Sequence, residues 1–258
     1  MSKILRALFC AALAVAAPGC GLATTIALIS TSGSSSRSSA AVPAPQVSSV
    51  TPNQVSHGGG ETITIRGENF PSDAAVSIGG VSAANVQFVS GQELRLTVPR
   101  NPLVGTAPVV VTNPNGGSGT LSSGFTLTNQ VPSVTFGPLA TPQAQNVVLS
   151  LTLVDPESDM IDLTLEVDTG NGTFQTIPSS QILSGALSGI ASSPQGVEHK
   201  LTWNSAVFLP SQDASAVRFR ATPRDTSDQQ DGSPATSTPF AVQNNTPVSL
   251  ELSQPGKD

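Results

Sequence analysis

The chain has 258 residues, of which 11% are charged and 4% aromatic, and its formal net charge is −6. It contains 23 glycines and 21 prolines, but no tyrosine and a single tryptophan. Low charge with many turn-forming residues is typical of exported all-β domains rather than of helical enzymes. The acidic balance argues against nucleic acid and anionic membrane surfaces as partners, because both require a basic footprint.

The N-terminus predicts an export signal. Lys3 and Arg6 precede an apolar run, LFCAALAVAA, at residues 8–17. A bacterial lipoprotein signal places its lipid-bearing cysteine directly after such a run, and Cys20 follows Ala17-Pro18-Gly19. Cys10 is removed with the signal, so Cys20 is left without an intramolecular partner. We therefore expect a lipoprotein-type signal peptide at residues 1–19 and lipid attachment at Cys20.

Two other interpretations of this end stay open. Ordinary cleavage near Ala14-Val15-Ala16 leaves a soluble protein, whereas an uncut segment 7–29 carries no charge and is long enough to span a bilayer. Residues 20–45 are rich in Ser and then in Pro, with almost no large apolar side chains after residue 29. Such a segment cannot offset its ordering entropy by burial, and it predicts a flexible tether.

Residues 46–129 predict a β-sandwich. In TITIRG, Ile63 and Ile65 alternate with polar residues, which is the period of a half-buried strand. LRLTVP at residues 94–99 repeats this alternation, and Gly79-Gly80 suits a two-residue hairpin turn. The expected core also contains Phe70 and Phe125.

Several motifs of this segment occur in the order that one family of modules has. They are Val50-Thr51-Pro52, glycines 58–60, Gly67-Glu68-Asn69-Phe70, Val98-Pro99, Val111-Thr112-Asn113-Pro114 and Phe125. The segment resembles an IPT/TIG domain, an immunoglobulin-like sandwich common in exported and cell-surface proteins. Leu127 stands where the family often has Tyr, and a Leu fills the same core volume. Rel-type relatives bind DNA through such domains, but the few arginines here form no basic cluster, so that role is not carried over.

Residues 130–243 predict a second sandwich. The expected strands span residues 133–136, 147–154, 161–167, 173–177, 198–203, 217–223 and 238–242. Seven short strands in about 110 residues suit this fold. The stretches DPESD, HKLTWNSA and VRFRATPRD resemble the fibronectin-III-like repeats of bacterial exported proteins. We expect residues 180–197 to form a long Gly/Ser connection and residues 244–258 a frayed tail.

The sequence contains few of the residues and motifs that catalysis requires. His57 and His199 lie in different predicted domains, and a serine without a base and an orienting acid is only a turn residue. The sequence lacks a GxSxG elbow, an HExxH helix, a phosphate-binding loop and a CxxC pair. We therefore expect no catalytic residues, no cofactor and no enzymatic activity. Trp203 shares a face with Leu201, which predicts core packing rather than a platform for sugar stacking.

Acidic residues gather in the second half. Asp155, Glu157 and Asp159 follow an apolar strand, and a later loop carries Asp225, Asp228 and Asp231. Calcium takes about six to eight oxygen ligands, which two such loops could supply. The favoured interpretation is a solvated turn with local Asp capping, so no metal is expected and Asp155, Glu157 and Asp159 are only secondary calcium candidates. That interpretation predicts a melting-temperature difference below ~2 °C between calcium and chelator.

These features predict an all-β protein of two tandem immunoglobulin-like β-sandwiches behind a signal peptide and a tether. The predicted role is that of a non-catalytic, monomeric module of the bacterial cell envelope, lipid-anchored at Cys20, which serves interaction or spacing. Its partner is expected to be an envelope protein or a glycan, and it meets the membrane only through its lipid. One alternative is a soluble secreted or periplasmic module for glycan binding or calcium-assisted adhesion. The other is an accessory, non-catalytic component of a carbohydrate-acting system.

Overall fold

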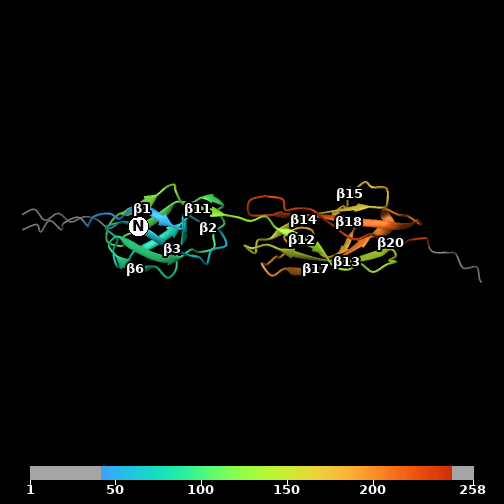
Figure 1. Cartoon of the computed structure of the whole chain (residues 1–258), viewed down its shortest axis with the longest axis horizontal. Coiled ribbons are helices and arrows are strands. Elements are labelled where there is room, and N and C mark those ends of the chain that lie inside the picture. The colour runs from blue at the N-terminus through green and yellow to red at the C-terminus, as the bar shows by residue number, and fades with distance from the viewer. Residues whose placement is uncertain (1–41, 246–258) are drawn as a thin grey trace, which may run out of the picture. The chain divides into compact units, whose positions relative to one another are not determined.

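The computed structural model describes residues 42–245, which form two β-sandwiches almost without helix (Figure 1). Both sandwiches belong to one compact unit that begins at Ala41. The predicted signal peptide, Cys20 and most of the tether lie outside the described residues. Within residues 42–245, no helix is long and apolar enough to cross a membrane.

The first sandwich is built from two antiparallel sheets. One sheet has the order β1 (Gln46–Thr51), β3 (Thr62–Glu68), β7 (Glu93–Thr97) and β6 (Gln87–Ser90). The other has the order β10 (Ser118–Leu121), β9 (Val109–Thr112), β4 (Ala75–Ile78) and β5 (Val81–Ser82). A small third sheet joins β2 (Gln54–Ser56), β11 (Thr126–Thr128) and β8 (Gly105–Thr106). Lettered in chain order, the two main sheets read A-B-E-D and G-F-C-C′, which is the arrangement of immunoglobulin-like sandwiches.

The core of the first sandwich follows the predicted alternation. Ile63 and Ile65 on β3 are fully buried, as are Val109 and Val111 on β9 of the other sheet. The predicted core positions Phe70 and Phe125 are 4% and 0% exposed. Gly79 and Gly80 take φ of 55° and 86° at the β4–β5 turn, which confirms the predicted hairpin.

The second sandwich repeats this architecture. One sheet has the order β12 (Ser133–Phe136), β13 (Asn146–Val154), β17 (Val197–Asn204) and β16 (Ile182–Ser184). The other runs β15 (Gln175–Thr176), β14 (Ile161–Asp168), β18 (Asp213–Asp225) and β19 (Ala235–Thr236), and β20 (Phe240–Gln243) also pairs with β18. In chain order these sheets read A-B-E-D and C′-C-F-G. The predicted immunoglobulin-like fold is therefore present in both halves.

Aromatic side chains fill the centre of the second core. Trp203 is fully buried, and its ring meets the Phe219 ring edge-on, with 5.4 Å between centroids. Phe219 in turn stacks on Phe240 at 5.3 Å. This geometry confirms the core assignment of Trp203, and it removes the ring from any sugar-binding surface.

Two expectations for the second sandwich are wrong in part. The connection 180–197 is no bare loop, because it contains β16 and places Ile190, only 4% exposed, in a β-bridge with Ile161. Asn244 is not the start of a frayed tail. It is 6% exposed, and its side chain accepts a hydrogen bond from Gln145 N at 2.7 Å and donates one to the Leu209 carbonyl at 3.0 Å. A buried amide of this kind must be hydrogen-bonded, which holds the end of the described chain.

Candidate functional site

The DPESD turn between β13 and β14 forms the centre of the candidate site. Asp155 Oδ1 accepts hydrogen bonds from the backbone N–H groups of Glu157, at 2.9 Å, and Asp159, at 3.0 Å. The expected local capping is therefore present. The expectation of a solvated turn is wrong, however, because Asp155, Glu157 and Asp159 are 0%, 4% and 5% exposed.

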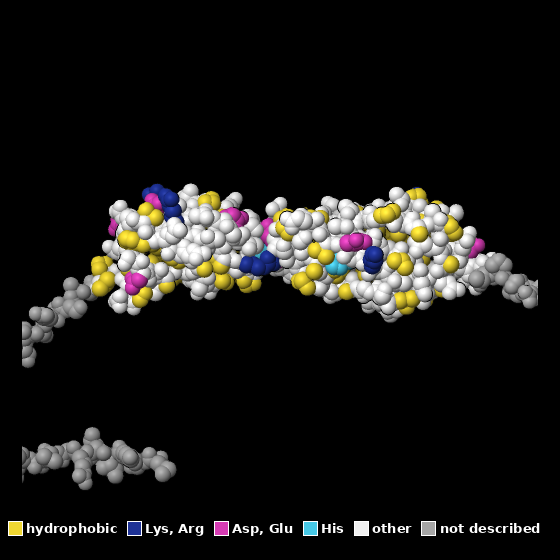
Figure 2. Space-filling model, turned by 90° about the horizontal axis from the view of Figure 1, so that it is seen from below, with side chains coloured by type: hydrophobic (Ala, Val, Ile, Leu, Met, Phe, Trp, Pro, Cys, Tyr) yellow, Lys and Arg dark blue, Asp and Glu magenta, His cyan; other side chains and the backbone are white. Residues whose placement is uncertain are grey.

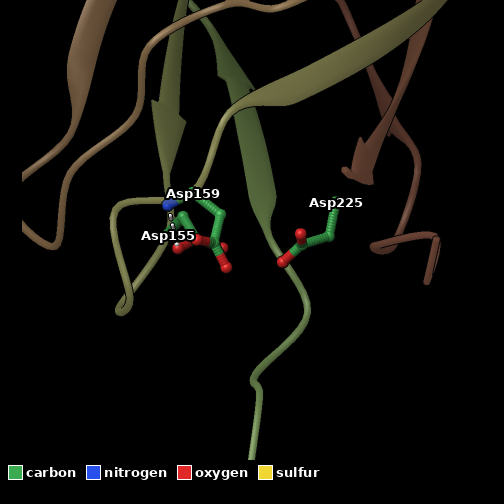
Figure 3. A group of neighbouring side chains, drawn as sticks. All are labelled: Asp155, Asp159 and Asp225. Carbon is green, nitrogen blue, oxygen red and sulfur yellow. Dashed lines mark hydrogen bonds between the residues drawn. The ribbon is translucent and has the colours of Figure 1, made fainter. Parts of the chain in front are cut away.

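A third aspartate reaches this turn through the pairing of β14 with β18. Asp225 stands opposite Ile161 in that ladder, so its side chain arrives beside Asp155 and Asp159. One carboxylate oxygen from each of these three aspartates lies within 4.8 Å of the others. Figure 3 shows Asp225 pointing across toward the other two carboxylates. We call Asp155, Asp159 and Asp225 the aspartate cluster.

The other acidic candidates of the sequence lie apart from this cluster. Asp231 is exposed and faces Arg224 at 3.4 Å, and Asp228 caps its own loop by accepting a hydrogen bond from Gln230 N. Glu157 turns toward the first sandwich, where its Oε1 accepts a hydrogen bond from Ser56 Oγ at 2.9 Å. The structure thus joins two of the three calcium candidates to Asp225 and gives Glu157 a different role.

Asp159 connects the cluster to two cationic side chains of the first sandwich. Arg100 donates hydrogen bonds to the Asp159 carboxylate and to the Glu157 carbonyl. His57, which is 1% exposed, places its Nε2 2.7 Å from Asp159 Oδ2 and 3.0 Å from Asn129 Oδ1. Burial lowers the pKa of His57, but a hydrogen bond with the Asn101 carbonyl and the charge of Asp159 outweigh it and raise the pKa above 6.5.

The linker between the sandwiches completes these contacts. Asn129 Nδ2 donates a hydrogen bond to Asp225 Oδ2 at 2.7 Å, and Gln130 N donates one to Glu157 Oε2 at 3.3 Å. Ser227 N donates to Asp225 Oδ1 at 2.7 Å. Residues of the first sandwich, the linker and the second sandwich therefore meet at the DPESD turn, and we call this region the junction.

The surroundings of Asp155 disfavour its charged form. Burial is the largest effect on the pKa of Asp155, and it raises this pKa. Repulsion by Asp225, Asp159 and Glu157 raises the pKa further, whereas the hydrogen bond from the Asp159 N–H lowers it. Asp155 Oδ2 is fully buried and has no hydrogen-bond donor among the described residues. Chemically, the cluster is a set of hard oxygen ligands that suits a divalent cation.

An open pocket gives access to one side of the junction. It measures about 460 Å³ and is lined by residues of both sandwiches, among them Arg100, Asp159, Thr226 and Ser227. Because Asp159 lines the pocket and belongs to the cluster, solvent and small ions reach the edge of the cluster through it.

Sequence reasoning missed His57, Arg100 and Asn129 as residues of this site. All three lie more than twenty residues before the DPESD turn, in the first sandwich or the linker. The only local signal is at Gly58, next to His57, where an added Cβ would lie 3.4 Å from the Glu157 Cα. Such a close approach of two segments leaves no periodic pattern in the sequence.

The fold and the sequence of the first half agree on its class. Its sheets define an immunoglobulin-like sandwich, and residues 45–128 match the family described as IPT/TIG domain. This part of the chain is therefore an IPT/TIG domain, as the order of its motifs predicts. No curated protein matches the chain.

Solved structures that match the chain include an adhesin, a protein of a glucan utilization locus and fibronectin(III)-like modules. The chain is 14% identical to the adhesin InvE of Yersinia pseudotuberculosis, over 76% of this chain and 58% of that one, with a TM-score of 0.40. It is 19% identical to the Bacteroides ovatus mixed-linkage glucan protein SGBP-B, over 78% and 45%, with a TM-score of 0.29. It is 11% identical to the fibronectin(III)-like modules of Clostridium thermocellum CbhA, over 83% of this chain and 99% of that one, with a TM-score of 0.29.

Several of these matches concern parts of longer proteins. The chain spans 12% of the plexin A4 extracellular region and 50% of a Bacteroides thetaiotaomicron protein described as a putative phosphatase.

Proposed function

We propose that this chain is a non-catalytic, exported module of the bacterial cell envelope, tethered by a lipid at Cys20, in which the two sandwiches act as a jointed spacer. The observation that carries the spacer role is the junction. Ser56, His57 and Arg100 of the first sandwich contact Glu157 and Asp159 of the second through side-chain hydrogen bonds and ion pairs. Domains joined only by a flexible linker lack such contacts and move independently.

The surface is compatible with a spacer. On the face shown in Figure 2, apolar side chains are scattered and charged side chains are few, without a basic patch. Scattered apolar residues are ordinary on a soluble domain, whereas a docking site needs a contiguous patch. The proposed contact with the membrane is therefore through the lipid, and export is supported by the charged and apolar pattern of residues 1–19.

One observation favours the alternative of a binding module for a glycan or an envelope protein. Phe88 and Val89 are 44% and 51% exposed on β6, at the edge of the first sandwich. An exposed aromatic ring on an edge strand offers a surface for stacking or for strand addition. Trp203, by contrast, is not available for this purpose because it is buried.

The lipid tether is tested by comparing the wild type with Cys20→Ser in a bacterial host. We expect the wild type in the membrane fraction with a fatty-acid label, and the variant unlabelled and in the soluble fraction. A Cys10→Ser variant is the matched control, because Cys10 is predicted to leave with the signal peptide and should not affect labelling. A soluble wild type whose N-terminus maps away from Cys20 would contradict the tether and favour the secreted or periplasmic alternative.

A further inference from the structure

Two carboxylates of the aspartate cluster have no cationic partner. Asp159 is compensated by Arg100 and His57, but Asp155 and Asp225 contact no Lys, Arg or His within residues 42–245. Both are fully buried. Buried like charges at this separation repel strongly unless a cation or a proton compensates them.

Asp155 supplies a separate indication of a ligand. Its Oδ1 already accepts two backbone N–H groups, so the conformation of the turn does not need the second oxygen. Oδ2 is buried without a donor among the described residues, in the group of carboxylates that also contains Asp159 and Asp225 (Figure 3). A buried acceptor left unpaired destabilises the folded state, and more so when it is charged. An atom placed in this way is explained by a cation bound to it.

We propose that Asp155, Asp159 and Asp225 bind a divalent cation, calcium, at the junction face of the second sandwich. The donors are carboxylate oxygens from one turn and the end of one strand, which is the ligand type that calcium prefers. Three protein oxygens do not complete the shell of about six to eight, and the adjoining pocket lets water supply the remainder. Thiolate ligands, which favour softer metals, do not occur in residues 42–245.

The location gives this site a consequence for the neighbouring sandwich. The DPESD turn carries the cluster residues Asp155 and Asp159 and also presents Glu157 to Ser56. A cation held by Asp155 and Asp225 would fix the turn against β18 in the conformation that the first sandwich contacts. Calcium would thereby stiffen the junction, whether or not the chain is lipid-anchored.

The proposal is tested on the full chain by thermal unfolding in CaCl₂ and in EDTA, and by calorimetric titration with CaCl₂. At calcium well above its dissociation constant, the wild type should melt about 5 °C or more higher than in EDTA. In Asp155→Asn, the retained Oδ1 still accepts both backbone N–H groups while the free anionic oxygen is lost. This variant should show a calcium shift below about 1 °C, yet melt in EDTA at or above the wild type, because a repelling buried charge is gone.

Asp168→Asn is a matched control. Asp168 is also buried, and its Oδ1 likewise caps a turn by accepting the N–H groups of Gly170, Asn171 and Gly172, but it lies outside the cluster. Its calcium shift should equal that of the wild type, as should that of the exposed Asp231→Asn. Asp225→Asn provides a second cluster variant, which should lose the shift in the same way as Asp155→Asn.

Three results would overturn the proposal. The first is a wild-type melting-temperature shift in calcium below about 2 °C with no heat of calcium binding. The second is a calcium shift in Asp155→Asn and Asp225→Asn that equals the wild-type shift. The third is a wild-type melting temperature that rises in MgCl₂ but not in CaCl₂. The first result means that calcium does not bind at the aspartate cluster. None of these outcomes depends on where the protein fractionates, so they are independent of the lipid tether.

Discussion

At the scale of single residues, the Glu166–Arg220 pair shows how register determines electrostatics. The two residues stand opposite each other on β14 and β18, and Arg220 donates two hydrogen bonds to the carboxylate, at 2.6 and 2.8 Å. The Arg220 guanidinium also lies 4.4 Å from the centre of the Phe174 ring. The hydrogen bonds from Arg220 lower the pKa of Glu166 below 4.5, although partial burial acts in the opposite direction.

This pair predicts part of the acid sensitivity of the second sandwich. A carboxyl whose pKa is lower in the folded state stabilises that state above its unfolded value of 4.5, and the contribution disappears as the pH falls through the folded value. In Glu166→Gln this contribution is absent, so unfolding measured from pH 7 to pH 3 should depend less on pH below about 4.5. Glu198→Gln, an exposed carboxyl on β17, is the control and should follow the wild type. Parallel pH profiles for all three proteins would show that the pair contributes nothing.

At the scale of structural elements, the junction depends on Arg100. This residue follows β7 in the first sandwich, and its guanidinium reaches the Glu157 carbonyl and the Asp159 carboxylate of the second. The side chain is 51% exposed, so the ion pair by itself contributes only about 0–1 kcal/mol. Its larger effect is positional, because it donates to two groups of one turn and so restrains that turn.

Arg100→Ala should loosen the DPESD turn without unfolding either sandwich. We expect faster amide hydrogen exchange at Glu157 and Asp159, whose N–H groups bond Asp155, and a loss of global stability below about 1 kcal/mol. Arg95→Ala is the matched control, because Arg95 is similarly exposed but pairs with Glu93 inside the first sandwich. Unchanged exchange in Arg100→Ala would mean that the second sandwich holds the turn by itself.

At the scale of the whole molecule, the two sandwiches keep separate cores. One hydrophobic cluster draws on residues 50–127 and the other on residues 134–242, and they share no residue. The junction between them consists of polar and charged contacts. Since hydrophobic burial is the dominant stabilising term, each sandwich should have a free energy of unfolding largely its own.

This separation is measurable because Trp203 is the single tryptophan and lies in the second core. Leu94 is fully buried in the first core, and Leu94→Ala should destabilise that sandwich by about 2–5 kcal/mol. In urea unfolding followed by circular dichroism, the midpoint of the first sandwich should then move to lower urea. The midpoint of the transition followed by tryptophan fluorescence should stay in place. The reciprocal variant Leu149→Ala should move the fluorescence transition. Equal shifts of both signals in Leu94→Ala would instead show that the junction couples the sandwiches into one cooperative unit.

Local sequence signals determined the fold class, the approximate positions of most strands and the family of the first sandwich. The alternation at Ile63 and Ile65 is a property of one strand, so it is readable without knowledge of the partner strand. Family motifs also have local causes. An added Cβ at Gly67 would lie 1.8 Å from the Gln46 carbonyl oxygen, so close approach of β1 and β3 excludes any larger residue there. Turn chemistry likewise predicted that Asp155 caps its own turn.

Only the tertiary structure decided what surrounds that turn. Its three acids are spaced as in a solvent-exposed loop, yet all three are buried, and Asp159 contacts His57 and Arg100 of the first sandwich. Asp225 joins Asp155 through the register of β14 with β18, which places Asp225 opposite Ile161 although the two are far apart in the sequence. Asn244, which we predicted to be frayed, is buried and hydrogen-bonded to Gln145 and Leu209. These partners are distant in the sequence and lie beside Asn244 only in the folded chain. Burial and charge compensation depend on all the residues that lie nearby in space. These residues come from segments far apart in the sequence, and no periodic pattern in the sequence shows that such segments meet.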